Sequence, residues 1–360
     1  MTDIDRSLSD EVAAELTARG AVWAPFEGLS LPAHFGDAAR EWRAAREGAA
    51  AFVAGYRQLV AASGDDRIAF LQGMLSNDVK RLAPGHGLYA AQLDQTGKVM
   101  TDMRLYAEPA RVLIDVVAWR GAAMRQRLEK FLVADDVELT PLGDEAPLVQ
   151  LEGPLATAVA REALGIDVVP STPLDHLTAS FNGASIRVVA ASEVERGGVL
   201  LCGTPASLVP VLDACRDAGA SLAGMRALDT LRIEAGIAWP GIDMDETTLI
   251  METGREAAVS FTKGCYLGQE VLERVAARGH VNRRLSGLLL TGAALPPRRA
   301  PVLADGREVG YVTSAAHSPL LERPIALAII HRKHWDAGEH VQVGGVEATV
   351  AALPFDHRPD

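Results

Sequence analysis

The region from Arg283 onward constrains the fold most, because it consists of short apolar runs separated by turn-forming residues. The runs are RRLSGLLLTG, APVLADGREVGYVTSAAH, IALAIIH and HVQVGGVEATVAAL, with Gly, Pro and Asp between them. Strands this short and this closely spaced are typical of a small antiparallel barrel or sandwich. We therefore expect residues 283–360 to form a C-terminal β-barrel domain.

Upstream of that region, helical and strand-like patterns alternate. The segment RIAFLQGMLSNDVKRL has apolar residues at helical spacing, whereas RVLIDVVA is strand-like. GLYAAQLDQTGKVMTDMRLYAE is expected to fold back as a hairpin at Gln95-Thr96-Gly97. LPAHFGDAAREWRAAREGAA is expected to be a linker followed by a short helix. The mixture predicts an α+β class.

A second group of segments, after Pro147, has the same character. Three strands are expected around one helix: PLVQLEG, ASIRVVAAS and GGVLLCG around PLATAVAREALG. With 360 residues, of which 48% are hydrophobic, the chain is long enough to form two or three domains with substantial cores.

Charge and composition limit the partners that we expect. The formal net charge of -12 argues against a protein that binds nucleic acid stably through phosphate contacts. No apolar run approaches the length of a membrane span, and MTDIDRSLSDEVAAELTARG lacks the pattern of a secretory signal. Only three cysteines are present, which suits a reducing compartment. We expect a soluble cytoplasmic protein without a membrane partner.

The segment FTKGCYLGQEVLER contains the most informative cysteine, Cys265. A helix is expected to begin around Gly268, which would place the thiol just before a helix N-terminus and beside Lys263. Both features would favour the thiolate and make it nucleophilic. The alternative is a buried cysteine that packs as a small hydrophobe. Because the cysteines are not closely spaced, we expect no metal site built from thiolates.

Two acidic residues stand where acids are unfavourable. Glu234 lies in the expected last turn of a helix that Gly236 ends, where the helix dipole opposes negative charge. Either Arg232 or solvent compensates it, or its carboxylate faces a ligand with hydrogen-bond donors, such as a pterin. Asp102 lies in an expected strand. On the solvent face it would be unremarkable, and on the inner face it would be a candidate proton acceptor.

A basic segment interrupts this acidic chain. No acidic residue occurs between the first and last of six arginines: Arg274, Arg278, Arg283, Arg284, Arg298 and Arg299. They belong either to a solvated loop or to a site for carboxylates or phosphates. The histidines of HRKHWDAGEH are expected to be surface residues and not metal ligands. The chain has neither a phosphate-binding glycine loop nor a Gly-x-Ser-x-Gly elbow.

Taken together, these motifs resemble the glycine-cleavage T-protein (aminomethyltransferase) superfamily. The resemblance covers nearly the whole chain and rests on LPAHFGDAAREWRAAREGAA, FLQGMLSNDV, ALDTLRIEAGIAWPGIDMDE and GREVGYVTSAAHSPLLERPIALAII. KGCYLGQE resembles the signature of the folate-binding YgfZ-type branch, which supports iron–sulfur enzymes, and aminomethyltransferases carry another sequence there.

The resemblance implies a three-lobed fold around a cavity that holds tetrahydrofolate or a one-carbon derivative. Residues 1–282 would form two interwoven α+β lobes, with the barrel following. Glu234 resembles the pterin-contacting glutamate, and Cys265 resembles the cysteine of the branch. Asp102 resembles the second acid of an Asp-Asp pair, but Thr101 stands at the first position. The other expected folate contacts are Lys263, Tyr266, Gln269, Arg283 and Arg284, the last two drawing the glutamate tail.

These features lead to three functional hypotheses. The first is a folate-binding accessory protein that assembles or repairs iron–sulfur enzymes, with iron–sulfur proteins or cluster-assembly factors as partners and Cys265 as a reactive thiol. Any role in tRNA modification would be direct or through a cluster enzyme. The alternative is a tetrahydrofolate-dependent aminomethyltransferase or related demethylase, which uses Asp102. The third is a module that only senses folate.

Overall fold

The computed structural model describes residues 8–143 and 145–355, which form two compact units. Unit 1 contains the described residues of Met1–Ala90 and Met103–Leu228, and unit 2 contains those of Ala91–Asp102 and Asp229–Asp360. Both units are therefore discontinuous in sequence. The predicted division into residues 1–282 and 283–360 separates the barrel from the rest of the chain, and it stays a prediction.

A six-stranded sheet forms one layer of unit 1, in the order β10-β11-β12-β9-β3-β13. Its neighbours are antiparallel except that β13 runs parallel to β3. The strands are β3 (Ala50–Val53), β9 (Ala146–Glu152), β10 (His176–Phe181), β11 (Ala184–Val189), β12 (Gly198–Gly203) and β13 (Ser221–Ala223). The expected strands PLVQLEG, ASIRVVAAS and GGVLLCG correspond to β9, β11 and β12, whereas β3 and β10 were not predicted.

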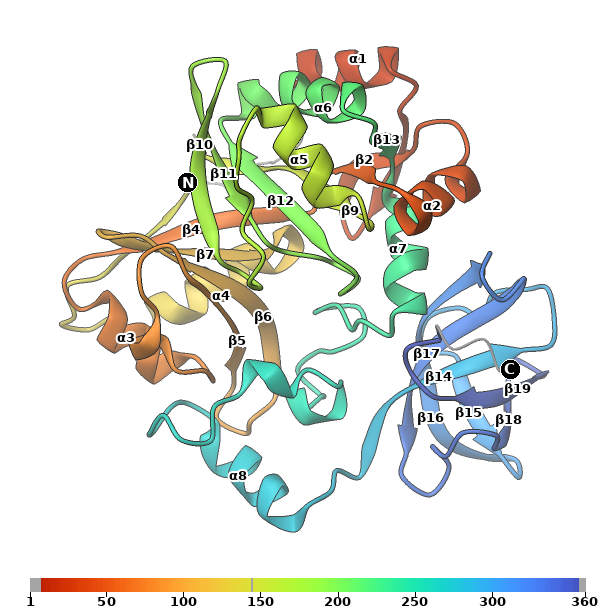
Figure 1. Ribbon diagram of the computed structural model, residues 1–360. Coiled ribbons are helices and arrows are strands. Elements are labelled where there is room, and N and C mark those ends of the chain that lie inside the picture. The colour runs from red at the N-terminus through yellow and green to blue at the C-terminus, as the bar shows by residue number, and fades with distance from the viewer. Residues whose placement is uncertain (1–7, 144, 356–360) are drawn as a thin grey trace. The chain divides into compact units, whose positions relative to one another are not determined.

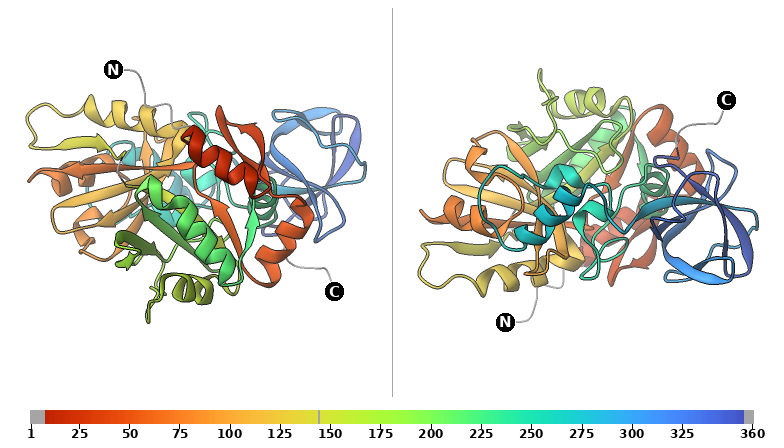
Figure 2. Two further views of the ribbon diagram at one scale, coloured as in Figure 1. Left: turned by 90° about the horizontal axis from the view of Figure 1, so that it is seen from above. Right: turned by 90° about the horizontal axis from the view of Figure 1, so that it is seen from below.

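Three helices pack against this sheet: α1 (Asp10–Ala18), α5 (Ala156–Leu164) and α6 (Leu208–Asp217). Leu16, Val159 and Leu212 from these helices share one hydrophobic core with sheet residues such as Val149 and Leu201. In the left view of Figure 2, α1 and α6 face the viewer. The helix α2 (Ala38–Glu47) contacts β13 and β3.

A second sheet has five strands in the order β5-β6-β7-β4-β8 (Figure 1), and all of it belongs to unit 1 except the parts of β5 and β6 that fall within Ala91–Asp102. The strands are β4 (Arg57–Ser63), β5 (Gly87–Leu93), β6 (Val99–Ala107), β7 (Arg111–Val117) and β8 (Glu138–Pro141). The short elements α3 (Arg67–Met74) and η1 (Val79–Arg81) follow β4, and α4 (Ala118–Glu129) follows β7. The predicted hairpin at Gln95-Thr96-Gly97 is confirmed as the β5–β6 turn, where Gly97 has a φ of 75°.

The predicted linker LPAH is wrong, because these residues belong to a strand. β1 (Val22–Phe26) and β2 (Leu29–His34) pair as a two-stranded antiparallel hairpin. Proline is tolerated in such strands, because an edge strand has backbone positions that need no N–H donor. Each of these strands contains a proline, Pro25 and Pro32, so a proline there does not indicate a linker.

Unit 2 ends in a closed antiparallel barrel of six strands in the order β14-β17-β16-β15-β18-β19, which confirms the predicted fold. The strands are β14 (Arg283–Leu290), β15 (Pro301–Ala304), β16 (Arg307–Ser318), β17 (Arg323–His331), β18 (His340–Val343) and β19 (Val346–Ala351). Leu288, Val302, Val312 and Ile330 belong to its apolar interior. The last residues of the predicted barrel region, 356–360, lie outside the described residues.

Two short α-helices lie in sequence between β13 and β14. α7 (Met225–Glu234) ends before Gly236, and α8 (Gln269–Arg278) precedes β14. Three 3-10 turns complete the described elements: η2 (Pro205–Ser207), η3 (Ile250–Glu252) and η4 (Glu256–Ala258). Within the described parts of the chain, no helix has the length and hydrophobicity needed to cross a membrane.

Candidate functional site

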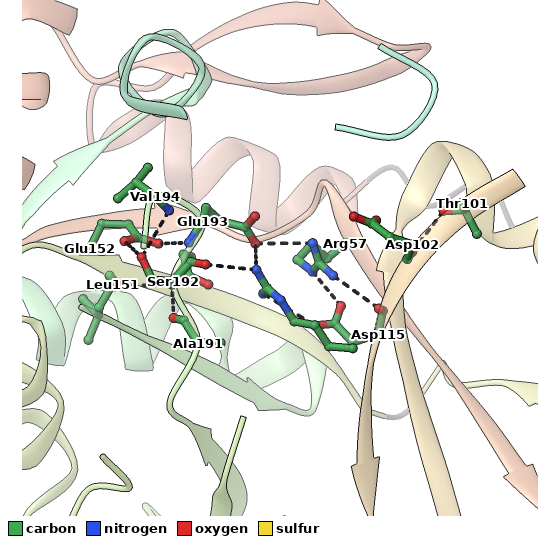
Figure 3. A network of polar contacts seen from close by, with 12 residues as sticks. Arg57, Thr101, Asp102, Asp115, Leu151, Glu152, Ala191, Ser192, Glu193 and Val194 are labelled. Atoms are coloured by element: carbon green, nitrogen blue, oxygen red, sulfur yellow. Dashed lines mark hydrogen bonds and ion pairs between the residues drawn. The ribbon is translucent and has the colours of Figure 1, made fainter. Parts of the chain in front are cut away.

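Four buried charged residues of unit 1 form a cluster, which we call the charged cluster: Arg57, Arg104, Asp115 and Glu193. Arg57 Nε lies 2.6 Å from Asp115 Oδ1, and Arg57 Nη1 lies 3.3 Å from Glu193 Oε1. Arg104 Nη2 lies 3.1 Å from the same Glu193 oxygen. Figure 3 shows the carboxylates of Asp115 and Glu193 on either side of the Arg57 guanidinium.

The pairing of three neighbouring strands brings these charges together. Asp115 on β7 pairs with Arg104 on β6 and with Leu59 on β4. Arg57 precedes Leu59 by two residues, and side chains two apart on a strand share a face. Glu193 is supplied by the 191–197 loop, which connects β11 to β12. The sheet register therefore determines which charges meet.

The cluster balances two cations against two anions, as burial of charge requires. Taking each ion out of water costs several kcal/mol, which pairing must offset. Tyr106 Oη donates to Asp115 Oδ2 at 2.7 Å. Burial, reinforced by the Asp115 charge, raises the pKa of Tyr106 well above its usual value, so the phenol remains a donor. Nη1 of Arg104, although buried, has no hydrogen-bond partner among the described residues.

Asp102, predicted from sequence, lies in β6 and is buried, with 9% of its surface exposed. This excludes the solvent-face alternative left open by the sequence. Its neighbour Thr101 is also buried, and Thr101 Oγ1 donates to the carbonyl oxygen of Asp102 at 3.0 Å (Figure 3). The role of Asp102 as a proton acceptor stays a prediction.

Glu234 lies in the last turn of α7, as predicted, and is 1% exposed. Solvent therefore does not compensate its charge. Ser318 Oγ on β16 donates to Glu234 Oε1 at 2.5 Å. This hydrogen bond directly supports a role for Glu234 in holding α7 to the barrel. Its contact with a pterin stays a prediction.

Arg232, two residues earlier, belongs to a second buried network, which we call the joint: Arg232, Asp243, Thr313 and Ser314. Arg232 Nη1 donates to Asp243 Oδ2 at 2.5 Å, and Arg232 Nη2 donates to Ser314 Oγ at 2.8 Å. The Arg-x-Glu pair of the motif thus contacts β16 twice. Both residues connect α7 with the barrel wall.

The segment around Cys265 has the predicted local structure. Cys265 is exposed, whereas Cys202 and Cys215 are buried. α8 begins at Gln269, after Gly268 in the left-handed region at a φ of 86°. An added Cβ on Gly268 would lie 2.4 Å from the carbonyl oxygen of Asp94. Glycine here lets the segment pack closely on the β5–β6 turn.

The other motif residues form contacts with one another. Lys263 Nζ lies 4.8 Å from the centre of the Tyr266 ring. Gln269 Oε1 accepts from the Tyr266 amide at 3.1 Å, and Gln269 Nε2 donates to Glu273. Burial raises the pKa of Tyr266 to about 12. Folate contacts by Lys263, Tyr266 and Gln269 stay predictions.

The two arginines predicted to draw a glutamate tail are already engaged by the protein. Arg283 Nε lies 3.0 Å from Glu252 Oε1, and Arg283 Nη2 donates to the Thr247 carbonyl oxygen. The Arg284 guanidinium lies 4.4 Å from the centre of the Trp335 ring. The described residues contain no group of three or more His, Cys, Asp or Glu side chains that could hold a metal ion.

Two family models match the chain. The model described as the GCVT N-terminal domain matches residues 12–263, and that of the glycine cleavage T-protein C-terminal barrel domain matches residues 283–356. The first match alone covers more than half of the chain. The protein belongs to the glycine-cleavage T-protein family.

Relatives within this family match over nearly the whole chain. An aminomethyltransferase of Thermus thermophilus is 31% identical over 339 residues, covering 93% of this chain and 95% of the relative. One from Nostoc sp. is 29% identical, covering 97% of this chain and 93% of the relative. The crystal structure of the aminomethyltransferase T from Bartonella henselae has a TM-score of 0.87 at 21% identity, covering 97% of this chain and 98% of that chain. The last likeness confirms the fold.

Sequence reasoning missed the charged cluster of this T-protein family member. Its members lie far apart in the chain, so no local motif contains them. One signal was present. Asp115 interrupts the apolar run VLIDVV, and Arg104 stands in the strand segment TDMRLY. A charge inside a strand expected to be buried indicates a paired partner elsewhere.

Proposed function

We propose that the protein binds tetrahydrofolate and carries out a folate-dependent one-carbon transfer, as an aminomethyltransferase or a related demethylase. The observation that carries the proposal is the full-length match to aminomethyltransferases in sequence and fold. Burial of Asp102 supports it, because a carboxylate away from solvent can accept a proton from an amine.

The charged cluster is the proposed pterin contact in unit 1. A pterin ring offers N–H donors together with carbonyl and ring-nitrogen acceptors. The cluster offers carboxylates as acceptors and a buried arginine N–H without a hydrogen-bond partner among the described residues. The donor and acceptor types therefore fit the ligand class. Folate, when bound, supplies the nitrogen that takes up the one-carbon unit.

A second candidate function, folate-dependent support of iron–sulfur enzymes, is favoured by Cys265. Its thiol is exposed, in contrast to the two other cysteines. Thr101, at the position that resembles the first acid of the Asp-Asp pair, also favours this candidate over aminomethyl transfer. Three cysteines are too few for the four thiolates of a common cluster, so the thiol would meet a cluster or partner transiently.

One experiment with two variants separates the candidates. Tetrahydrofolate-dependent release of ammonia from an aminomethylated lipoyl carrier is measured for the wild type, Asp102→Asn and Cys265→Ser. For the transferase, we expect wild-type turnover, a loss of roughly 10²–10⁴-fold in Asp102→Asn and little change in Cys265→Ser.

The same variants are then expressed in cells that lack the protein, and iron–sulfur enzyme activity is measured. For the accessory function, Cys265→Ser should bind folate normally yet fail to restore that activity. Absence of ammonia release by a wild type that binds folate would overturn the aminomethyltransferase form of the proposal. Full restoration by Cys265→Ser would remove the second candidate.

A further inference from the structure

We propose that Glu152 is a positioning residue for the proposed pterin contact: it clasps the 191–197 loop and thereby holds the Glu193 carboxylate between Arg57 and Arg104. The inference rests on the proposed function for its ligand, whereas the clasp can be tested without any ligand. Glu152 itself contacts neither arginine by a hydrogen bond, so it would act through Glu193.

Glu152 is the last residue of β9 and is completely buried. Its Oε1 accepts from the backbone N–H of Glu193 at 2.6 Å, and its Oε2 accepts from Ser192 Oγ at 2.7 Å. Figure 3 shows the Glu152 carboxyl and the Glu193 carboxylate on opposite sides of the Glu193 backbone. One carboxyl group therefore fixes the residue whose own side chain meets the arginines.

Further contacts hold the loop at both ends. Gln150 Nε2 donates to the Ala191 carbonyl oxygen at 2.8 Å, and the Gly153 amide donates to the Gly197 carbonyl oxygen at 3.3 Å. Gln150 and Glu152 are two residues apart on β9, so their side chains share a face of the sheet. Ser192 Oγ in turn accepts from the Val194 amide at 3.1 Å. Glu152 occupies the middle of this arrangement, at the position that fixes Glu193.

The surroundings of Glu152 explain its chemical state. Burial raises the pKa of Glu152 to about 8, and the like charge of Glu193 adds to this effect. Hydrogen bonds from the Glu193 amide and Ser192, and the charge of Arg104, act in the opposite direction. The pKa of Tyr56 is raised by burial first, and the charges of Glu193 and Glu152 add to that effect. A neutral carboxyl leaves the cluster with two cations and two anions, whereas ionisation would add a third anion.

When the Glu152 carboxyl is neutral, Oε1 still accepts from the Glu193 amide, whereas the hydrogen on Oε2 donates to Ser192 Oγ, so the bond between these two oxygens is kept with its direction reversed. A neutral side chain with one acceptor and one donor should therefore work as well as glutamic acid at neutral pH. Glutamine has both functions and nearly the same shape. Glu152→Gln should preserve the clasp, and Glu152→Ala should remove it. Glu41 provides a matched control, because its side chain is also buried and also accepts two hydrogen bonds, in this case from the backbone N–H groups of Phe35 and Gly224, at 2.6 and 3.0 Å.

The first measurement is amide hydrogen exchange of the full-length protein without ligand. Glu152→Ala should accelerate exchange of the 191–197 amides roughly tenfold, because two hydrogen bonds are lost. Glu152→Gln should leave it unchanged, and Glu41→Ala should not accelerate it selectively. If Glu152→Ala unfolds, Ser192→Ala serves instead and should accelerate exchange at Val194. Unchanged exchange in these variants, or equal acceleration in Glu41→Ala, would overturn the clasp.

The second measurement is calorimetric affinity for 5-formyltetrahydrofolate, a stable folate probe, between pH 6.5 and 9. Glu152→Ala should bind about tenfold more weakly at pH 7. Wild-type affinity should fall as pH rises through about 8, whereas Glu152→Gln should not follow that decline. A merely structural role would not produce this difference in pH profile. If the wild type binds the probe and Glu152→Ala binds it equally tightly, the positioning role is overturned.

The two failures are distinguishable. If the wild type does not bind the probe although Glu152→Ala loosens the loop, the clasp stands and the proposed function fails. If the wild type binds the probe and Glu193→Gln binds it with the same affinity, the charged cluster is not the pterin contact. The positioning role of Glu152 is then wrong as well.

Discussion

Arg104 in unit 1 and Arg232 in unit 2 are both buried, but they differ in how completely their donors are paired. Every guanidinium nitrogen of Arg232 has an acceptor among Asp229, Asp243, Ser314 and the Ile237 carbonyl oxygen. Arg104 pairs through Nη2 with Glu193 and Ser192, while its Nη1 has no hydrogen-bond partner among the described residues. Burial of a charge therefore does not by itself distinguish a candidate site from a structural contact.

The joint achieves its pairing through an irregularity in β16. Thr313 and Ser314 are neighbours, yet both hydroxyls donate to Asp243 Oδ1, at 2.6 and 2.7 Å. Successive side chains on a regular strand point to opposite faces. The register of β16 against β17 shifts between Val312 and Ser314, and such a bulge redirects one side chain. The barrel is thus built to satisfy this carboxylate.

The largest effect that we predict breaks the joint. Asp243→Ala should lower the free energy of unfolding by about 3–5 kcal/mol, because it leaves the Arg232 guanidinium buried without its strongest partner. Urea unfolding measures this loss. Folate affinity of the protein that remains folded should change little. The double variant Arg232→Met with Asp243→Leu should lose less than Asp243→Ala, and an equal or larger loss would contradict this account.

The next effect sharpens the comparison by using pH. The raised pKa of Glu152, about 8 against an ordinary 4.5, means that the folded protein binds the proton more tightly. This stabilisation is complete below pH 4.5 and is lost as pH rises to about 8. Between those limits, wild-type stability should fall by up to ~1.4 kcal/mol per pH unit relative to Glu152→Gln. Parallel pH profiles of the two proteins would disprove the shift.

The smallest effect concerns Arg283 and Arg284 of the basic segment, of which Arg284 is exposed. Folates with longer glutamate tails should bind more tightly, and Arg284→Ala should reduce that preference only slightly, because Arg284 is stacked on Trp335 and Arg283 is paired with Glu252. The preference should shrink as salt is added, since exposed charges are screened. Calorimetry with mono- and triglutamates at two salt concentrations measures it. If added salt does not change the preference, these arginines do not attract the glutamate tail.

Much of the fold follows from local pattern. The apolar runs after Arg283 predicted the barrel, and Gln95-Thr96-Gly97 predicted a turn that the structure confirms. The β1–β2 hairpin was missed because Pro32 suggested a linker, although proline is compatible with an edge strand. Local sequence does not reveal whether a strand lies at an edge.

For the site as well, features set by neighbouring residues could be predicted and contacts between distant segments could not. The start of α8 next to Gly268 was readable from neighbouring residues. The meeting of Arg57, Asp115 and Glu193 was not, because it depends on strand register and on a loop held by Glu152. The partner of Glu234, a serine on β16, was equally hidden. Contacts set by pairing of distant strands require the structure.

The discontinuity of the two units has a consequence for synthesis of the chain. Residues Ala91–Asp102 leave the ribosome before most of unit 1, yet they belong to unit 2, whose other residues begin at Asp229. The hairpin tip must therefore wait for the 247–249 segment, with which it pairs through Lys98 and Val99. Contacts so distant in sequence slow folding. If the chain were expressed as two fragments divided between Leu228 and Asp229, the hairpin tip would be on one fragment and the 247–249 segment on the other. We therefore expect both units to fold only when the whole chain is expressed.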